Sequence, residues 1–298
     1  MKKFLKWTLM VVLSVVGIGL IASIYFIHKF NNSFNKKCEI EPVMITIPTD
    51  SVSIERGYIL STECRGCHGG DLAGKYFFDD SKIGKIASSN LTRAKASPTE
   101  FYTDKDWIRA LRHGVGKNGK ALFVMPSNSY THYSDQDLGC LIAYLKTLTP
   151  KENSFNPPTF TKFAKILGGA GQMGESFSYN IIDHEKAKNI AHIDKVPSKE
   201  YGLYMSNICG CTTCHKPDFK GGKSIDPVAP PVPDISKSGN LGKWTRDQFI
   251  EVLKTGKTPE GKSLDGRYMP FTGIAAFSRE EIGSIYDYIV SKPAFFDK

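Results

Sequence analysis

Two short stretches of this sequence place a histidine directly after a pair of cysteines that are three positions apart. The first is CRGCH at residues 64–68, and the second is CTTCH at residues 211–215. Three kinds of site use cysteines at this spacing: a zinc tetrahedron of thiolates, a redox-active dithiol and a covalent attachment site for haem. The duplicated motif therefore restricts the chemistry of the chain more than any other feature.

The spacing and the added histidine separate these three interpretations. A compact zinc ribbon brings its cysteine pairs close in sequence, whereas 147 positions separate Cys64 from Cys211. A thioredoxin-like dithiol needs no adjacent histidine and lies in a βαβ pattern, which this sequence lacks. Two cysteines near the start of a helix can instead reach both vinyl groups of one porphyrin, and the next residue then directs an imidazole toward the iron. The motifs favour covalent haem.

A longer internal repeat surrounds the two motifs. Residues 103–114 and 245–256 each predict an amphipathic helix that follows a threonine N-cap and ends at glycine. Further along, Ser134 and Ser278 each precede a terminal helix and have an acidic residue three positions later, as in a capping box. The sequence therefore predicts two similar helical domains.

The repeat also contains a methionine followed by proline. Met125 lies 57 positions after His68, and Met269 lies 54 positions after His215. A thioether is a soft ligand suited to the second axial position of haem iron, and the following proline disfavours helix at the methionine. We therefore expect both methionines to be iron ligands.

This pattern resembles the class I c-type cytochrome domain, present twice, over about residues 53–149 and 198–294. The resemblance implies an all-α fold with two tandem class I cytochrome c domains behind one N-terminal transmembrane helix. It also implies two haem c groups, and in each domain a first helix, with Gly57 or Gly202, that crosses the terminal helix holding Tyr144 or Tyr288. The expected segments are an anchor (1–37), a first domain (38–150), a linker (151–197) and a second domain (198–298). The expected haem attachment and iron-binding residues are Cys64, Cys67, His68, Met125, Cys211, Cys214, His215 and Met269.

The N-terminal segment predicts a membrane anchor. Residues 7–27 are 21 consecutive residues without a charge, and such a helix spans about 30 Å, the thickness of the apolar core of a bilayer. The segment is long for a signal peptide and lacks an A-x-A cleavage site, so we expect it to be retained. Three lysines on each side leave its orientation open. The resemblance places haem attachment outside the cytoplasmic membrane, so the haem domains should face the periplasm or the cell exterior.

The net charge does not indicate nucleic-acid binding. The chain has a formal charge of +9, but residues 1–37 contain six lysines and no acidic residue, so the rest of the chain carries only +3. Lysines beside an apolar segment are typical of a membrane surface.

The region between the domains and the remaining cysteines leave several possibilities open. Residues 160–167 predict a short amphipathic helix, which either packs on a domain or rests on the membrane or on a partner. Cys140 is expected to be buried in a terminal helix, whereas Cys38 and Cys209 could pair with each other or with another chain.

The function expected from these features is electron transfer in a respiratory chain. Iron with both axial positions filled does not readily bind a substrate, so we expect an electron carrier rather than an enzyme. Two alternatives remain: a haem enzyme such as a dihaem peroxidase, and the cytochrome subunit of a dehydrogenase complex. The expected partners are redox proteins (a dehydrogenase, a small cytochrome or an oxidase) and the membrane, through the N-terminal helix.

Overall fold

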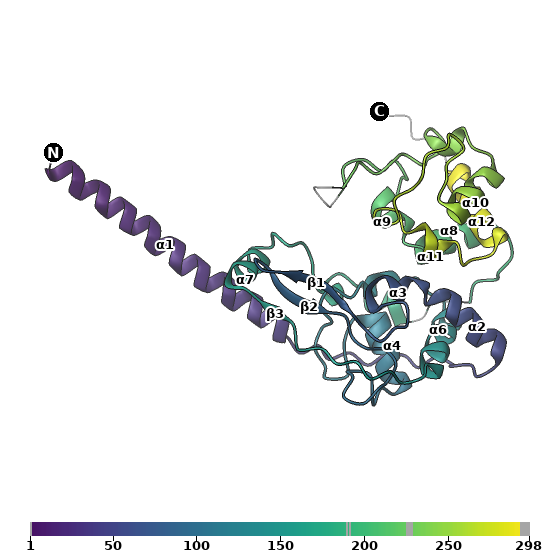
Figure 1. Ribbon diagram of the computed structural model, residues 1–298, viewed down its shortest axis with the longest axis horizontal. Helices are drawn as coiled ribbons and strands as arrows, with labels where there is room; N and C mark the ends of the chain where they lie inside the picture. Colours follow the sequence, from purple (N-terminus) through teal and green to yellow (C-terminus); the bar gives the residue numbers. More distant parts are fainter. Residues whose placement is uncertain (1, 189, 191, 225–228, 293–298) are drawn as a thin grey trace. The chain divides into compact units, whose positions relative to one another are not determined.

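The computed structural model describes residues 2–188, 190, 192–224 and 229–292. The fold is mostly helical, as predicted, with one small sheet that the sequence did not predict (Figure 1). The helices are α1 (Lys2–Asn35), α2 (Ser51–Leu60), α3 (Thr62–His68), α4 (Asp104–His113), α5 (Ser127–Tyr130), α6 (Asp135–Thr147), α7 (Lys162–Gly169), α8 (Lys199–Ile208), α9 (Cys211–His215), α10 (Arg246–Thr255), α11 (Phe271–Ile274) and α12 (Arg279–Ser291). The strands are β1 (Tyr76–Asp80), β2 (Gly84–Ala87) and β3 (Thr159–Phe160).

The described residues form two compact units. The first unit comprises those up to residue 42, together with 67–127 and 149–182. The second comprises residues 43–66 and 128–148 and the described residues from 183 onward. Each unit therefore combines segments that are far apart in the sequence.

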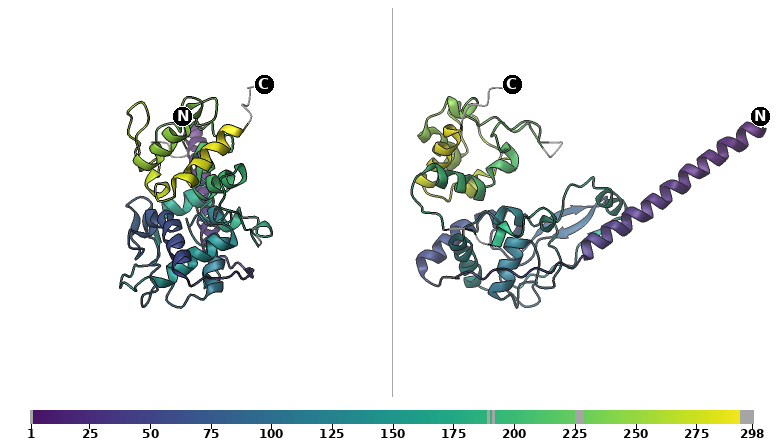
Figure 2. Two further views of the ribbon diagram at one scale, coloured as in Figure 1. Left: turned by 90° about the vertical axis from the view of Figure 1, so that its right-hand side faces the viewer. Right: turned by 180° about the vertical axis from the view of Figure 1, so that it is seen from behind.

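In the first unit, α1 is one unbroken helix, of which only the C-terminal part is covered by other elements (Figure 1; Figure 2, right). Within the part of the chain that the structure describes, it is the helix long and apolar enough to cross a membrane. Its last turns join a cluster of aromatic rings with centroids 5.0–6.4 Å apart. This aromatic cluster consists of Phe30, Phe34, Phe123, Phe160 and Phe177. Helix α1 thus continues directly into the folded part of the first unit.

The small antiparallel sheet has the strand order β1-β2-β3. The hairpin of β1 and β2 pairs Tyr76 with Ala87 and Asp80 with Gly84. The edge strand β3 comes from the linker, and Lys85 pairs with Thr159. A Cβ added to Gly84 would lie 2.0 Å from the carbonyl oxygen of Thr159, so the close approach of β3 requires glycine at this position.

The predicted helix ends are confirmed in both halves of the repeat. Thr103 caps α4 in a capping box with Asp106, and Thr245 caps α10 in the same way with Gln248. The residues that end the two helices, Gly114 and Gly256, have left-handed backbone conformations with φ of 66° and 71°.

The predicted helix crossings are also confirmed. In the second unit α2 packs on α6, and α8 packs on α12. A Cβ added to Gly57 would lie 2.0 Å from the carbonyl oxygen of Cys140 and 2.7 Å from Cβ of Tyr144. A Cβ added to Gly202 would lie 2.0 Å from the carbonyl oxygen of Ser284. Any larger residue at either glycine would therefore separate the crossing helices.

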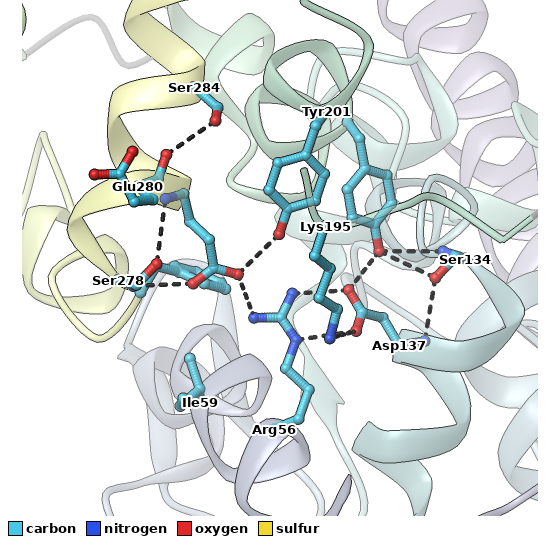
Figure 3. A network of polar contacts seen from close by, with 12 residues as sticks. Arg56, Ile59, Ser134, Asp137, Lys195, Tyr201, Ser278, Glu280 and Ser284 are labelled. Carbon is cyan, nitrogen blue, oxygen red and sulfur yellow. Dashed lines mark hydrogen bonds and ion pairs between the residues drawn. The ribbon is translucent and has the colours of Figure 1, made fainter. Parts of the chain in front are cut away.

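A buried polar network lies at the start of the two terminal helices (Figure 3). Ser134 caps α6, and its side chain accepts a hydrogen bond from the backbone N–H of Asp137. Ser278 caps α12 and accepts one from the backbone N–H of Glu281 in the same way. The Arg56 guanidinium of α2 binds both of these acids. It donates two hydrogen bonds of 2.9 Å to Asp137 and one of 2.6 Å to Glu281. One arginine therefore connects two helix starts that are far apart in the sequence.

Two tyrosines of α8 complete this network. The Tyr204 hydroxyl donates to Asp137 over 2.7 Å, and the Tyr201 hydroxyl donates to Glu281 over 2.9 Å. Burial alone would raise the pKa of both carboxyl groups, but the guanidinium beside them holds the pKa of Asp137 and of Glu281 below its usual value. Both acids are therefore held in their charged form.

Candidate haem-binding sites

The first cysteine motif lies on α3. Cys64 is buried, with its Sγ 3.5 Å from the hydroxyl oxygen of Tyr130, and Cys67 is exposed. His68 ends the helix, and its ring is mostly buried. Its Nδ1 lies 2.7 Å from the carbonyl oxygen of Ser89. The motif thus combines two free thiols and one oriented imidazole on a single short helix.

The second motif lies on α9 and has the same local structure. Cys211 is half-buried and Cys214 is exposed, and the mostly buried His215 is again the last residue of the helix. Its Nδ1 lies 3.0 Å from the carbonyl oxygen of Pro233. The second site therefore repeats both the sequence and the hydrogen bond of the first.

These two hydrogen bonds determine which histidine nitrogen is available to a metal. A carbonyl oxygen only accepts, so Nδ1 of His68 and of His215 must carry the proton. The lone pair of a neutral ring is then on Nε2. Burial lowers the pKa of both rings, which favours this neutral form. The donor set therefore fits axial ligation of haem iron through Nε2.

The two Met-Pro pairs occupy matching positions. Met125 comes two residues before α5, and Met269 comes two residues before α11. Both methionines are half-buried. In each case the backbone N–H two residues later donates to the methionine carbonyl, over 2.8 Å in the first half and 2.7 Å in the second. The backbone turn is therefore the same at both sites, and ligation by the two sulfur atoms stays a prediction.

Sequence reasoning missed several residues that suit a haem site. The carbonyl groups of Ser89 and Pro233 orient the histidines, and because every residue has a carbonyl, no sequence signal marks them. In the first unit, Arg93 Nε and Trp107 Nε1 are buried and have no hydrogen-bond partner among the described residues. Buried donors of this kind suit the carboxylate groups of haem propionates. For Trp107 the sequence offered one signal: the matching position of the repeat is Phe249, which has no hydrogen-bond donor in its side chain.

The cysteines do not form an alternative site. All seven carry free thiols, so the pairing of Cys38 with Cys209 that the sequence allowed is not observed. Cys140 is buried in α6, as predicted. Among the described residues, no three histidine, cysteine, aspartate or glutamate side chains are grouped as a metal site would require.

Comparison with known families identifies a cytochrome domain in each half. Residues 54–149 match the family described as Cytochrome c. Residues 201–289 match the family described as Cytochrome C oxidase, cbb3-type, subunit III.

Curated relatives are similar over most of this chain. The gluconate 2-dehydrogenase cytochrome c subunit of Pantoea cypripedii is 37% identical over 72% of this chain and 53% of the relative. The fructose dehydrogenase cytochrome subunit of Gluconobacter japonicus is 29% identical over 81% of this chain and 53% of the relative. The alcohol dehydrogenase (quinone) cytochrome c subunit of Gluconobacter oxydans (strain 621H) is 25% identical over 82% of this chain and 56% of the relative. The chain spans about half the length of these relatives. The chain is a c-type cytochrome with a cytochrome c domain in each half.

Proposed function

We propose that this chain is an electron carrier that holds two covalently attached haem c groups at the outer face of the cytoplasmic membrane. The observation that supports this most directly is the pair of matching helices, α3 and α9, each of which presents two free thiols and a histidine bonded through Nδ1 to a backbone carbonyl. When bound, haem c supplies a one-electron couple between ferric and ferrous iron.

The residues that would hold each haem follow from these helices. Cys64 and Cys67 would form the thioether links at the first site, and Cys211 and Cys214 would form those at the second. His68 and His215 would bind iron through Nε2. Met125 and Met269 would supply the second protein ligand to each iron, because each lies in the same turn before a short helix.

Iron bound by both a histidine and a methionine would have no open ligand position, and this favours electron transfer as the activity. A haem enzyme such as a dihaem peroxidase needs an open or displaceable ligand position on one iron. Both halves here have a half-buried methionine, followed by proline, in the same backbone turn, so no feature marks one half as the one with an open position. The peroxidase alternative is therefore not favoured.

The relatives indicate the kind of partner. They are the cytochrome subunits of fructose, alcohol and gluconate dehydrogenases. We propose that this chain likewise receives electrons from a dehydrogenase subunit and passes them to an acceptor on the oxidase side. Helix α1, with its charge-free stretch of residues 7–27, would keep the carrier in the membrane with Met1 in the cytoplasm.

Haem content and ligand binding test this proposal together. The membrane-extracted holoprotein is assayed for covalent haem per chain, then reduced and exposed to carbon monoxide. We expect two haems per chain and an absorption spectrum that the gas does not change. A single covalent haem would refute the two-site proposal, and a spectrum that shifts with carbon monoxide would show that one iron has a displaceable ligand.

A matched pair of variants assigns the ligands. Met125→Ala and Met269→Ala should each make one haem bind carbon monoxide. Met173→Ala, which removes a half-buried methionine elsewhere in the first unit, should not. If neither of the first two variants binds the gas, the sixth ligand is another residue.

A further inference from the structure

Helix α7 packs against α1 before the apolar stretch of α1 has ended. A Cβ added to Gly169 would lie 2.0 Å from the carbonyl oxygen of Phe26, and a Cβ added to Gly168 would lie 2.6 Å from the Phe30 ring. Phe26 is itself inside the charge-free stretch of residues 7–27. The C-terminal end of α7 is therefore level with the last apolar turn of the anchor.

This level corresponds to the edge of a bilayer. The charge-free stretch has 21 residues and as a helix is about as long as the bilayer core is thick, so little of it can extend beyond the core. Trp7 and Tyr25 lie near its two ends and are 68% and 60% exposed, as in the aromatic belts of membrane helices. If α1 spans the membrane, the C-terminal end of α7 must lie at the boundary between acyl chains and headgroups.

The exposed side chains of α7 are near its N-terminal end. Phe163 lies six residues before Gly169, so along the helix it is no more than about 9 Å from this level. Ala164 and Gly169 are buried, which fixes one face of the helix inside the first unit. Phe163 is 53% exposed, beside the exposed Lys162 and the half-buried Lys165. An apolar ring next to lysines is the composition of helices that lie in the membrane interface, where the ring enters the acyl boundary and the ammonium groups meet phosphates. No acidic residue lies within residues 160–174 to oppose this contact.

We propose that α7 is a membrane-contact helix that docks on anionic phospholipid headgroups. Phe163 enters the interface, and Lys162 and Lys165 bind lipid phosphates. Because the opposite face of α7 packs on α1, this contact fixes the orientation of the first unit relative to the membrane. The inference rests on the membrane anchoring in the proposed function, and it adds a second attachment beside the anchor.

A spin label at position 163 tests the depth of α7. The Phe163→Cys holoprotein is labelled with a nitroxide and reconstituted in nanodiscs of phosphatidylcholine and phosphatidylglycerol in equal parts. Its access to oxygen is compared with its access to a water-soluble nickel chelate. The matched control is Ile181→Cys, because Ile181 is 59% exposed in the same unit and lies outside α7. Cys38, Cys140 and Cys209 are buried, so they compete little for the label.

We expect the label at 163 to lose access to the nickel chelate on entering nanodiscs, while the label at 181 keeps it. Adding Lys162→Glu and Lys165→Glu should restore nickel access at 163. Nickel access at 163 equal to that at 181 would overturn the inference, and so would protection at 163 that requires an added dehydrogenase. A chain that fails to co-elute with nanodiscs would instead refute the anchoring itself, so the two failures are distinguishable.

Discussion

Replacing Arg56 should destabilise the second unit more than any comparable change at the surface. The Arg56 side chain is 10% exposed, and those of its partners Asp137 and Glu281 are 1% and 14% exposed. Removing the cation leaves two mostly buried carboxylates beside each other. Removing one partner of a buried ion pair costs about 3–5 kcal/mol, because an uncompensated charge stays buried.

The remaining contacts allow a narrower estimate. In Arg56→Met, Asp137 still accepts a hydrogen bond from Tyr204 and faces Lys195 at 3.4 Å, and Glu281 still accepts one from Tyr201. We therefore expect the lower part of the range, a loss of about 3 kcal/mol in the free energy of unfolding. Since 1.4 kcal/mol corresponds to a factor of ten, the ratio of unfolded to folded protein should rise roughly a hundredfold.

Urea unfolding of the holoprotein, followed by far-ultraviolet circular dichroism, measures this loss. The matched control is Arg279→Met on α12, because Arg279 is half exposed and binds the exposed acids Glu251 and Asp247. Surface pairs of that kind contribute about 0–1 kcal/mol. The reasoning is refuted if Arg56→Met unfolds at the same urea concentration as the unaltered protein, or if Arg279→Met loses as much stability.

Three further predictions concern pH, packing and ligation. The two acids bound by Arg56 have lowered pKa values, so their stabilising contribution is present above about pH 4 and is lost as the pH falls through the folded-state pKa values. Acid titration of stability should therefore show a steeper loss in the unaltered protein than in Arg56→Met, and equal slopes would contradict this. Gly57→Ala should lower the free energy of unfolding by about 1–3 kcal/mol or more, because the added Cβ clashes with α6. Thermal unfolding measures this loss. Gly70→Ala is the control and should lose less stability, because a Cβ at Gly70 meets no atom within 4 Å. Potentiometric titration of Met125→Ala should show one haem with a lowered reduction potential and one unchanged, because loss of the thioether removes the ligand that raises the potential. Two unchanged potentials would mean that Met125 is not a ligand.

Local features of the fold were predictable from the sequence because their causes are local. A threonine followed by an acid or amide three positions later marks the start of α4 and of α10, and a glycine marks the end of each helix. Each motif brings its cysteines and histidine onto one short helix by spacing alone. The crossings at Gly57 and Gly202 came from the resemblance to cytochrome domains, and the structure supplies the steric reason.

Features that depend on distant segments were not predictable. The sheet requires β3, which lies more than seventy positions after β2 in the sequence, and its two residues carry no strand pattern of their own. Arg56 binds acids that are 81 and 225 positions away, so its role depends on tertiary structure. The acceptors of the two histidines are backbone carbonyls, which any residue could have supplied.

If α1 spans the membrane as proposed, the aromatic cluster at its C-terminal end has a geometric consequence for encounters between this cytochrome and membrane proteins. No loop separates the apolar stretch of α1 from Phe30 and Phe34, which are packed in that cluster. The helix would therefore fix both the distance of the first unit from the membrane and its rotation about the helix axis. Inserting one residue between the apolar stretch and Phe30 would rotate the unit by about 100° and raise it by about 1.5 Å. A flexible tether would absorb such a change. Here, the direction in which the first unit faces follows from the helical phase of α1.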